Sequence, residues 1–152
     1  MAAIRTWFFH TWFRLNRPMT LGVRAIIENQ DGRVLLVRHT YTPGLYLPGG
    51  GVERGEPAHT ALQRELVEEA GVALTGASEL LGIYSNHRVF RNDHVLLYRL
   101  RSSEWSSCTA TQIGEISETL WVDPQNPPED ITPGNKRRLD EIYKGVTLCN
   151  YW

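Results

Sequence analysis

Residues 50–72 read GGVERGEPAHTALQRELVEEAGV, a glycine-rich loop followed by a segment with the pattern of a short helix. Glu65, Glu68 and Glu69 have the spacing of three and four residues that brings side chains together on one helix face. Like charges at this spacing repel, and the helix dipole disfavours negative charge near Gly71, where the helix is expected to end. Carboxylates gathered at this position therefore predict a bound cation, and hard oxygen ligands suit Mg²⁺ or Mn²⁺.

The whole chain has the size and composition of a single globular domain. Its 152 residues are 41% hydrophobic and 22% charged, which excludes the disordered and fibrous classes. The formal net charge of −1 provides no basic field, so no extended nucleic acid is expected as a partner. Cys108 and Cys149 belong to no CxxC motif or Cys/His cluster, which predicts a reducing, cytoplasmic location. No apolar run approaches the roughly 18 residues that a transmembrane helix needs.

Residues 1–18, MAAIRTWFFHTWFRLNRP, are expected to form an aromatic-rich N-terminal helix or arm ahead of a domain expected over residues 19–152. The apolar residues fall near helical spacing, and arginines lie between them. Such a helix packs on its own domain or on a second subunit, which would make a homodimer, or it lies on a membrane surface. A signal peptide is disfavoured because His10 and Arg14 interrupt the apolar stretch and no A-x-A site follows.

The hydrophobic pattern elsewhere predicts strands and helices in mixed order. Residues 21–28 and 33–39 are apolar runs joined by a turn that contains Asp31-Gly32, which is typical of a β-hairpin. Residues 57–70 are expected to be a helix, with Pro57 in its first turn and Gly71 after its end. Further strands are predicted over residues 45–47, 80–84, 94–100 and 120–123, and a second helix over residues 136–144. This combination predicts a layered α/β domain.

Residues 50–72 resemble the signature of the Nudix hydrolases, G-x5-E-x7-R-E-U-x-E-E-x-G-U, in which U is a bulky aliphatic residue. Every fixed position matches, namely Gly50, Glu56, Arg64, Glu65, Leu66, Glu68, Glu69, Gly71 and Val72. The resemblance implies an α/β/α sandwich with a mixed β-sheet. It also implies Mg²⁺- or Mn²⁺-dependent hydrolysis of the diphosphate bond in a nucleoside diphosphate linked to another moiety.

The resemblance also implies roles for individual residues of the motif. The implied metal ligands are the backbone carbonyl of Gly49 and the carboxylates of Glu65, Glu68 and Glu69. Arg64 and Glu56 are expected to pair with each other and to orient these carboxylates. Glycines at the loop let the backbone approach metal and phosphate without interference from a Cβ atom.

The general base stays open among several carboxylates. Glu115 lies in a polar loop ahead of the last predicted strand, where many family members carry a catalytic glutamate, and Glu118 is the second candidate there. Glu68 or Glu69 of the motif is the alternative, acting on a metal-bound water whose pKa the metal lowers.

Substrate contacts are expected from side chains outside the motif. Arg38, Arg88 and Arg91 are candidates for binding phosphate, and Tyr84 or Tyr41 for stacking on a base. Residues 87–89 match neither the ADP-ribose nor the diadenosine polyphosphate subfamily marker, so the leaving moiety is not specified.

Three alternatives keep the fold and change the activity. A ligand-sensing domain need not keep every metal carboxylate, and all are present here. An RNA 5′-end pyrophosphohydrolase would favour a basic groove, which the near-neutral charge does not support. An isopentenyl diphosphate isomerase relies on a catalytic cysteine, and neither cysteine lies near the motif in sequence.

Overall fold

The first two predicted strands form, but they do not pair as a hairpin. The computed structural model describes residues 19–111 and 114–152, so the predicted N-terminal helix or arm over residues 1–18 lies outside the described residues. Strands β1 (Thr20–Ile27) and β2 (Val34–His39) are joined by a tight turn and by a single bridge between Glu28 and Val34. Beyond that bridge they separate, because each strand pairs with a different neighbour, and the hairpin prediction was wrong.

The central sheet is mixed, as predicted. β1 runs parallel to β5 (Asp93–Leu100) along its whole length, and β5 is antiparallel to β4 (Glu79–Ser85). β2 pairs antiparallel with β7 (Ile116–Val122), which is longer than the strand predicted over residues 120–123. Residues 45–47, predicted as a strand, form only isolated bridges, at Leu45 and Tyr46.

A short strand pair beside this sheet was not predicted. β3 (Val72–Leu74) pairs antiparallel with β6 (Trp105–Ser107). Strands of three residues are too short to show the alternation of apolar and polar residues on which such a prediction depends.

The two helices lie close to where the sequence predicts them. α2 (Ala58–Ala70) begins after Pro57 and ends at Gly71, whose φ of 60° lies in the left-handed region that glycine favours. Helix α3 (Pro133–Tyr143) begins three residues before the predicted start at residue 136, because Pro133 occupies its first turn.

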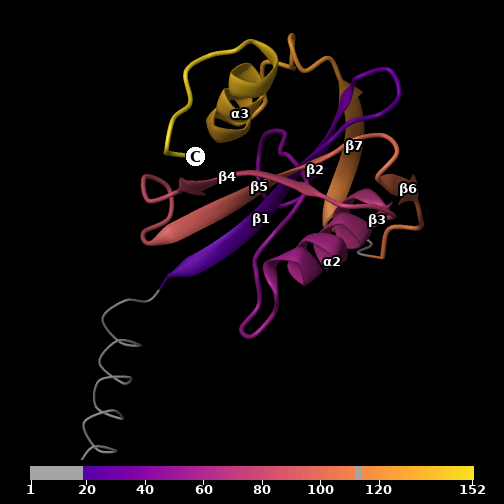
Figure 1. Ribbon diagram of the computed structural model, residues 1–152, viewed down its shortest axis with the longest axis horizontal. Coiled ribbons are helices and arrows are strands. Elements are labelled where there is room, and N and C mark those ends of the chain that lie inside the picture. Colours follow the sequence, from indigo (N-terminus) through magenta and orange to yellow (C-terminus); the bar gives the residue numbers. More distant parts are fainter. Residues whose placement is uncertain (1–18, 112–113) are drawn as a thin grey trace, which may run out of the picture.

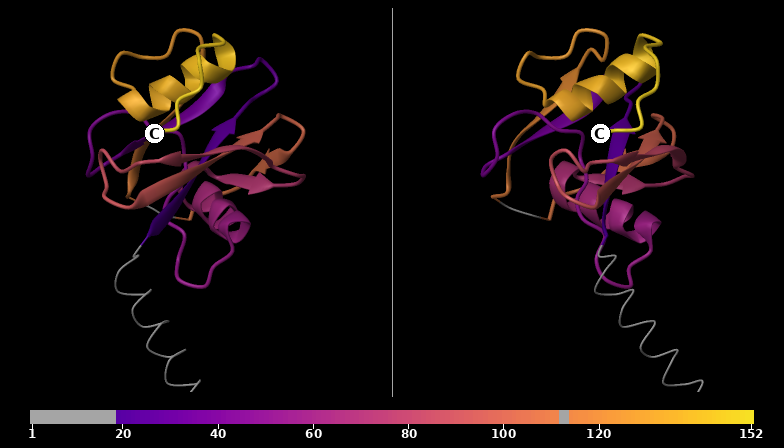
Figure 2. Two further views of the ribbon diagram at one scale, coloured as in Figure 1. Left: turned by 60° about the vertical axis from the view of Figure 1, so that its left-hand side comes forward. Right: turned by 90° about the vertical axis from the view of Figure 1, so that its left-hand side faces the viewer.

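Helices α2 and α3 cover opposite sides of the strands (Figures 1 and 2). Leu62 and Leu66 of α2 pack in one buried cluster with Val23 and Ile27 of β1. Leu139 of α3 belongs to a second cluster, together with apolar residues from the other face of the strands, among them Ile26, Leu36 and Leu97. Side chains alternate across a strand, so β1 and β5 supply both clusters and the fold is an α/β/α sandwich.

The glycine-rich loop lies along the second edge of β1. The carbonyls of Pro48 and Gly50 accept hydrogen bonds from the Ala25 and Val23 amides, each at 2.9 Å. Gly49 approaches β1 so closely that a Cβ there would lie 2.1 Å from the Val23 carbonyl oxygen. This contact fixes the loop against the sheet and holds it beside the C-terminal half of α2. No helix of the described part of the chain is long and apolar enough to span a membrane.

Candidate functional site

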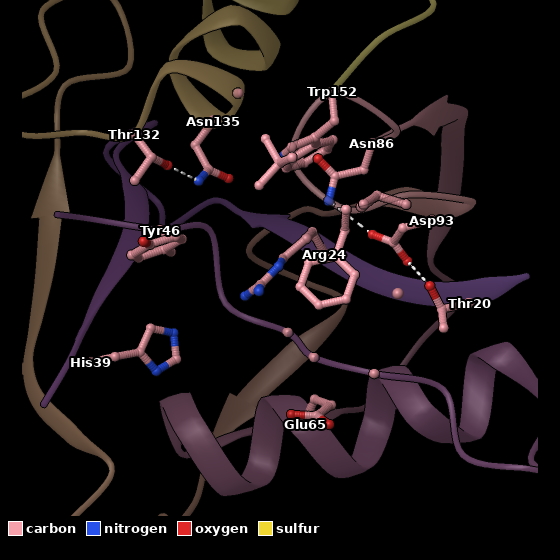
Figure 3. A pocket seen from close by; sticks show the side chains of 18 of the residues that line it. Thr20, Arg24, His39, Tyr46, Glu65, Asn86, Asp93, Thr132, Asn135 and Trp152 are labelled. Atoms are coloured by element: carbon pink, nitrogen blue, oxygen red, sulfur yellow. Dashed lines mark hydrogen bonds between the residues drawn. The ribbon is translucent and has the colours of Figure 1, made fainter. Parts of the chain in front are cut away.

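A cleft of about 830 Å³ opens between the glycine-rich loop, α2, the β4–β5 turn and the start of α3 (Figure 3). One end is lined by acidic and aromatic side chains, namely Glu65, Glu69, Glu115, His39, Tyr41 and Tyr46. The other end is lined by polar and aromatic side chains, among them Asn86, Asp93, Phe90, Asn135 and Trp152. Arg24 also lines the cleft and projects into it from β1.

The motif glutamates come together because helical spacing places them on one face of α2. Glu65 and Glu69 line the cleft, and Glu68 lies beside them within reach of the same arginine, Arg64. The Glu65 carboxylate occupies space next to Gly50, where a Cβ would lie 2.4 Å from its atoms. A side chain at position 50 would therefore displace this carboxylate from its present place. Burial raises the pKa of Glu65, and the charge of Arg64 opposes that rise.

Glu69 is the most buried of these glutamates, with 6% of its surface exposed. Its Oε2 accepts a hydrogen bond of 2.9 Å from the Gly49 amide, and its Oε1 lies 3.6 Å from His39 Nε2. Burial raises the pKa of Glu69 to about 7, while the positive charge of Arg24 and the Gly49 amide act in the opposite direction. A carboxylate that is buried to this extent prefers its charged form only when positive charge is nearby.

Arg64 connects the motif glutamates with the loop. Its guanidinium forms two hydrogen bonds with Glu56, at 3.1 and 3.0 Å, and a third with the Gly51 carbonyl at 3.0 Å. Its Nη1 contacts Glu65 at 2.7 Å and Glu68 at 3.4 Å. The pKa of Glu56 is lowered by this pairing. Arg64 thus pairs with Glu56 and contacts the motif carboxylates, and it does not line the cleft.

The structure separates the two loop candidates for the general base. The amide and hydroxyl of Thr40 bind the carbonyls of residues 114–115, which places Glu115 at the cleft near Glu69. The carboxylate of Glu118 instead binds Arg38 Nε at 2.9 Å and does not line the cleft. Glu118 is paired with Arg38 in the β2–β7 register.

The residues predicted to bind substrate lie outside the cleft lining, with the exception of Tyr41. Arg38 forms ion pairs with Glu118 and with Asp130, at 2.9 and 2.7 Å, on the opposite face of β2 from His39. Tyr84 is buried in the core, with the Arg138 guanidinium 3.9 Å from its ring centre. Arg88 lies over the Tyr151 ring at 4.5 Å, and Arg91 is exposed on the β4–β5 turn.

Arg24 and His39 line the cleft and were not selected from the sequence. Arg24 Nη1 donates to the Leu47 carbonyl at 3.0 Å, and its charge acts on both Glu65 and Glu69. The pKa of His39 is lowered, first by burial and then by Arg24. The signal for Arg24 was present, because it is the one charged residue inside the apolar run Leu21 to Ile27. A buried strand carries such a charge only where it has a partner.

The donor set fits a divalent cation. Within residues 19–111 and 114–152, no three carboxylate, imidazole or thiol groups already converge as a ligand set. The oxygens nevertheless are of the hard type, and Gly50 leaves the space that the Glu65 carboxylate needs.

Comparisons with known proteins identify the family of the chain. The NUDIX domain family matches residues 18–142. A Bacillus subtilis protein named "Putative 8-oxo-dGTP diphosphatase" is 29% identical over 131 residues, which cover 86% of this chain and 85% of that protein. The ADP-ribose pyrophosphatase of Methanocaldococcus jannaschii is 37% identical over 87 residues, which cover 55% of this chain and 50% of that enzyme.

A solved structure shows the same fold. The MutT NUDIX hydrolase from Burkholderia pseudomallei superimposes with a TM-score of 0.69 at 24% sequence identity, over 82% of this chain and 98% of that one. The motif, the fold and the family match lead to one conclusion. The chain belongs to the Nudix family, as a pyrophosphohydrolase of nucleoside diphosphates linked to a second group.

Proposed function

We propose that the acidic end of the cleft binds Mg²⁺ or Mn²⁺ together with the diphosphate of a small nucleotide substrate. The proposed ligands are the Gly49 carbonyl and the carboxylates of Glu65, Glu68 and Glu69. The observation that carries this proposal is that Glu65, Glu69, Glu115 and Arg24 all line the same cleft. A diphosphate alone would be repelled by these acids, so the arrangement is useful only if a cation lies between them.

Bound at this position, a divalent cation would neutralise charge on the diphosphate and lower the pKa of a coordinated water. The protein's own groups then have separate tasks. Arg24 presents a positive charge to the substrate from the floor of the cleft, since its side chain projects into it (Figure 3). Arg64 holds the ligand carboxylates in orientation through Glu56 and the Gly51 carbonyl.

Glu115 is the proposed general base. It is exposed at the mouth of the cleft, close enough to Glu69 to raise the pKa of that carboxyl. An exposed carboxylate is accessible to an attacking water and can accept its proton. The glutamates of α2 would be engaged with the cation, which leaves this role to a carboxylate from another segment.

A screen of candidate substrates tests the proposed function. The panel comprises 8-oxo-dGTP, ADP-ribose, other nucleoside diphosphate derivatives, dinucleotides and an RNA with a 5′-triphosphate, each with Mg²⁺ and with Mn²⁺. Released phosphate products are measured for the wild-type protein and for Glu68→Gln. Turnover of a small nucleotide that is lost in the variant supports the proposal. Turnover that survives the substitution unchanged would overturn the metal assignment, and turnover of RNA alone would overturn the small-molecule assignment.

The ligand-sensing alternative has a distinct outcome in the same screen, whereas the isomerase alternative is judged from the positions of the cysteines. A ligand-sensing domain would bind nucleotides without releasing phosphate from any of them. The isomerase alternative needs a cysteine at the reacting carbon, and neither Cys108 nor Cys149 lines the cleft.

A further inference from the structure

Residues 149–152 fold back onto the domain and form one wall of the cleft, at the end away from the glutamates. The Ser85 amide donates to the Asn150 carbonyl and the Trp152 amide donates to the Ser85 carbonyl, each at 2.9 Å. These bonds extend the β4 edge by a short parallel bridge between Ser85 and Tyr151. The side chain of Trp152 lines the cleft beside Asn86 (Figure 3).

A buried ion pair on α3 anchors this segment. Arg138 is fully buried and donates to Glu141 at 2.6 Å and to the Cys149 carbonyl at 3.3 Å. Glu141 in turn accepts a hydrogen bond of 2.8 Å from the Cys149 amide. Two buried charges are costly unless they are paired, and here the pair also binds both polar groups of one backbone residue. The anchor therefore fixes where the segment leaves α3.

The Trp152 side chain is seated against α3 and the core. A Cβ at Gly134 would lie 2.6 Å from the indole Cδ1, so only a glycine at this position leaves room for the ring. The Tyr84 ring meets the indole edge to face, with ring centres 6.0 Å apart. Trp152 is thus held in a defined position while part of its surface remains exposed to the cleft.

An unsatisfied amide lies at the same end of the cleft. Asn135 is 1% exposed and lines the cleft, and its Nδ2 donates to the Thr132 hydroxyl. Its Oδ1 is buried without a hydrogen-bond partner among the described residues. A buried acceptor without a donor costs free energy, which a ligand with an N–H group on its edge would recover.

We propose that residues 149–152 form a nucleobase-binding wall, where Trp152 stacks on the base and Asn135 accepts a hydrogen bond from its edge. This inference rests on the proposed function, because it places the base at one end of the cleft and the diphosphate at the other. A flat heterocycle with N–H groups matches an aromatic face combined with a neutral acceptor.

The stacking role is tested by calorimetric titration of nucleoside 5′-monophosphates and of ribose 5-phosphate, which lacks the base. Trp152→Leu keeps apolar bulk without an aromatic face, and Trp152→Phe keeps an aromatic ring. Trp152→Leu is expected to raise the Kd of the best-bound nucleotide by roughly fivefold or more, with no change for ribose 5-phosphate. Trp152→Phe is expected to retain most of the affinity. Leu148→Ala, an exposed substitution in the preceding residues, is the matched control and should bind as the wild type does.

Two results would overturn the wall as a base site. One is an unchanged nucleotide Kd in Trp152→Leu, and the other is an equal loss for ribose 5-phosphate, which would mean that the segment only supports the fold. Thermal unfolding of both variants identifies the second case directly. Hydrolysis is not measured in this titration, so failure of the catalytic assignment leaves its outcome unaffected.

The Asn135 contact has its own signature. Asn135→Leu removes the acceptor while keeping a similar volume, and it is expected to reduce the difference in Kd among the four nucleobases. A uniform change for all four, or none, would remove Asn135 from the proposed site.

Discussion

Single residues of the cleft owe their roles to the face of the element on which they lie. His39 and Arg38 are neighbours in β2, yet His39 contacts Glu69 inside the cleft while Arg38 pairs with acids on the outer face. Glu115 and Glu118, the first and second candidates for the general base outside the motif, are also separated: Glu115 lines the cleft from the loop before β7, whereas Glu118 lies in β7 and pairs with Arg38. Residue type alone does not separate the members of these pairs. For Arg38 and His39 the alternation of side chains along β2 decides which one reaches the cleft, and for Glu115 and Glu118 the position in the loop or in β7 decides it.

The two acids beyond the motif give a matched pair of variants. Glu115→Gln is expected to lower kcat about 100-fold or more, since the amide cannot accept the proton of the attacking water. Glu118→Gln should stay near the wild-type rate, because Glu118 pairs with Arg38 away from the cleft. Steady-state rates on the best substrate of the panel measure both. A near-wild-type rate in Glu115→Gln would return the role of base to the glutamates of α2.

Substitutions of the adjacent glycines in the loop give a second pair of variants. The Cβ of Gly50→Ala would meet only the mobile end of Glu65, so the fold should remain while Glu65 is displaced and Mn²⁺ affinity falls about tenfold or more. The Cβ of Gly49→Ala would meet the backbone of β1, at a φ of 134°, so this variant should lose thermal stability. Calorimetric Mn²⁺ titration and thermal unfolding measure the two effects. If both variants changed equally in Mn²⁺ affinity and in thermal stability, the two glycines would not have these separate roles.

At the scale of elements, the helices follow the sequence and the strand partners do not. α2 is delimited by Pro57 and Gly71, both of which act through local backbone geometry. The turn after β1 also forms as predicted, through Asn29 hydrogen bonds to residues 31–33. The hairpin does not form because the two edges of β1 are occupied by other segments. One edge pairs with β5, which is distant in the chain, and the other binds the glycine-rich loop, which follows β2.

Helix α3 carries a pH-dependent contribution to stability. Hydrogen bonding to Lys136 and then to Lys144 lowers the pKa of Asp140 from its ordinary value of 3.8. A carboxyl whose folded pKa is lowered stabilises the fold above its unfolded pKa, and this stabilisation is lost as the pH falls through the folded pKa. Asp140→Asn should therefore be less stable than the wild type near neutral pH, by at most about 1 kcal/mol because the lysines are largely exposed. The difference should vanish at pH values below the folded pKa of Asp140.

Chemical denaturation across this pH range measures that difference. Glu129→Gln, an exposed acid in the loop before α3, serves as the comparison and should show no such trend. A difference between Asp140→Asn and wild type that persists undiminished at low pH would assign the effect to packing and not to charge.

At the scale of the whole molecule, cation binding and folding are expected to be coupled, because the proposed ligands come from two segments that only the folded chain brings together. Gly49 belongs to the loop along β1, and the glutamates belong to α2. A ligand that binds only the folded state stabilises it by about 2.7 kcal/mol at 100 times its Kd. For a domain of this size, that corresponds to an increase in Tm of roughly 5–10 °C.

Thermal unfolding with Mg²⁺, with Mn²⁺ and with a chelator measures this increase. The shift is expected in the wild-type protein and should be much smaller in Glu65→Gln and Glu69→Gln. The Arg38→Gln variant, which lies outside the cleft, should retain the full shift. An equal shift in all of these proteins would indicate binding at another surface.

The sequence by itself determined the family, the ends of α2 and the gathering of the motif glutamates, because each depends on spacing within one local stretch. Helical periodicity is enough to place Glu65, Glu68 and Glu69 on one face. The tertiary structure alone decided that β1 pairs with β5, that Glu115 and not Glu118 reaches the cleft, and that Arg24 and Trp152 line it. These features join residues far apart in the chain, and contacts of that kind depend on competition for strand edges and core space, which no local pattern records.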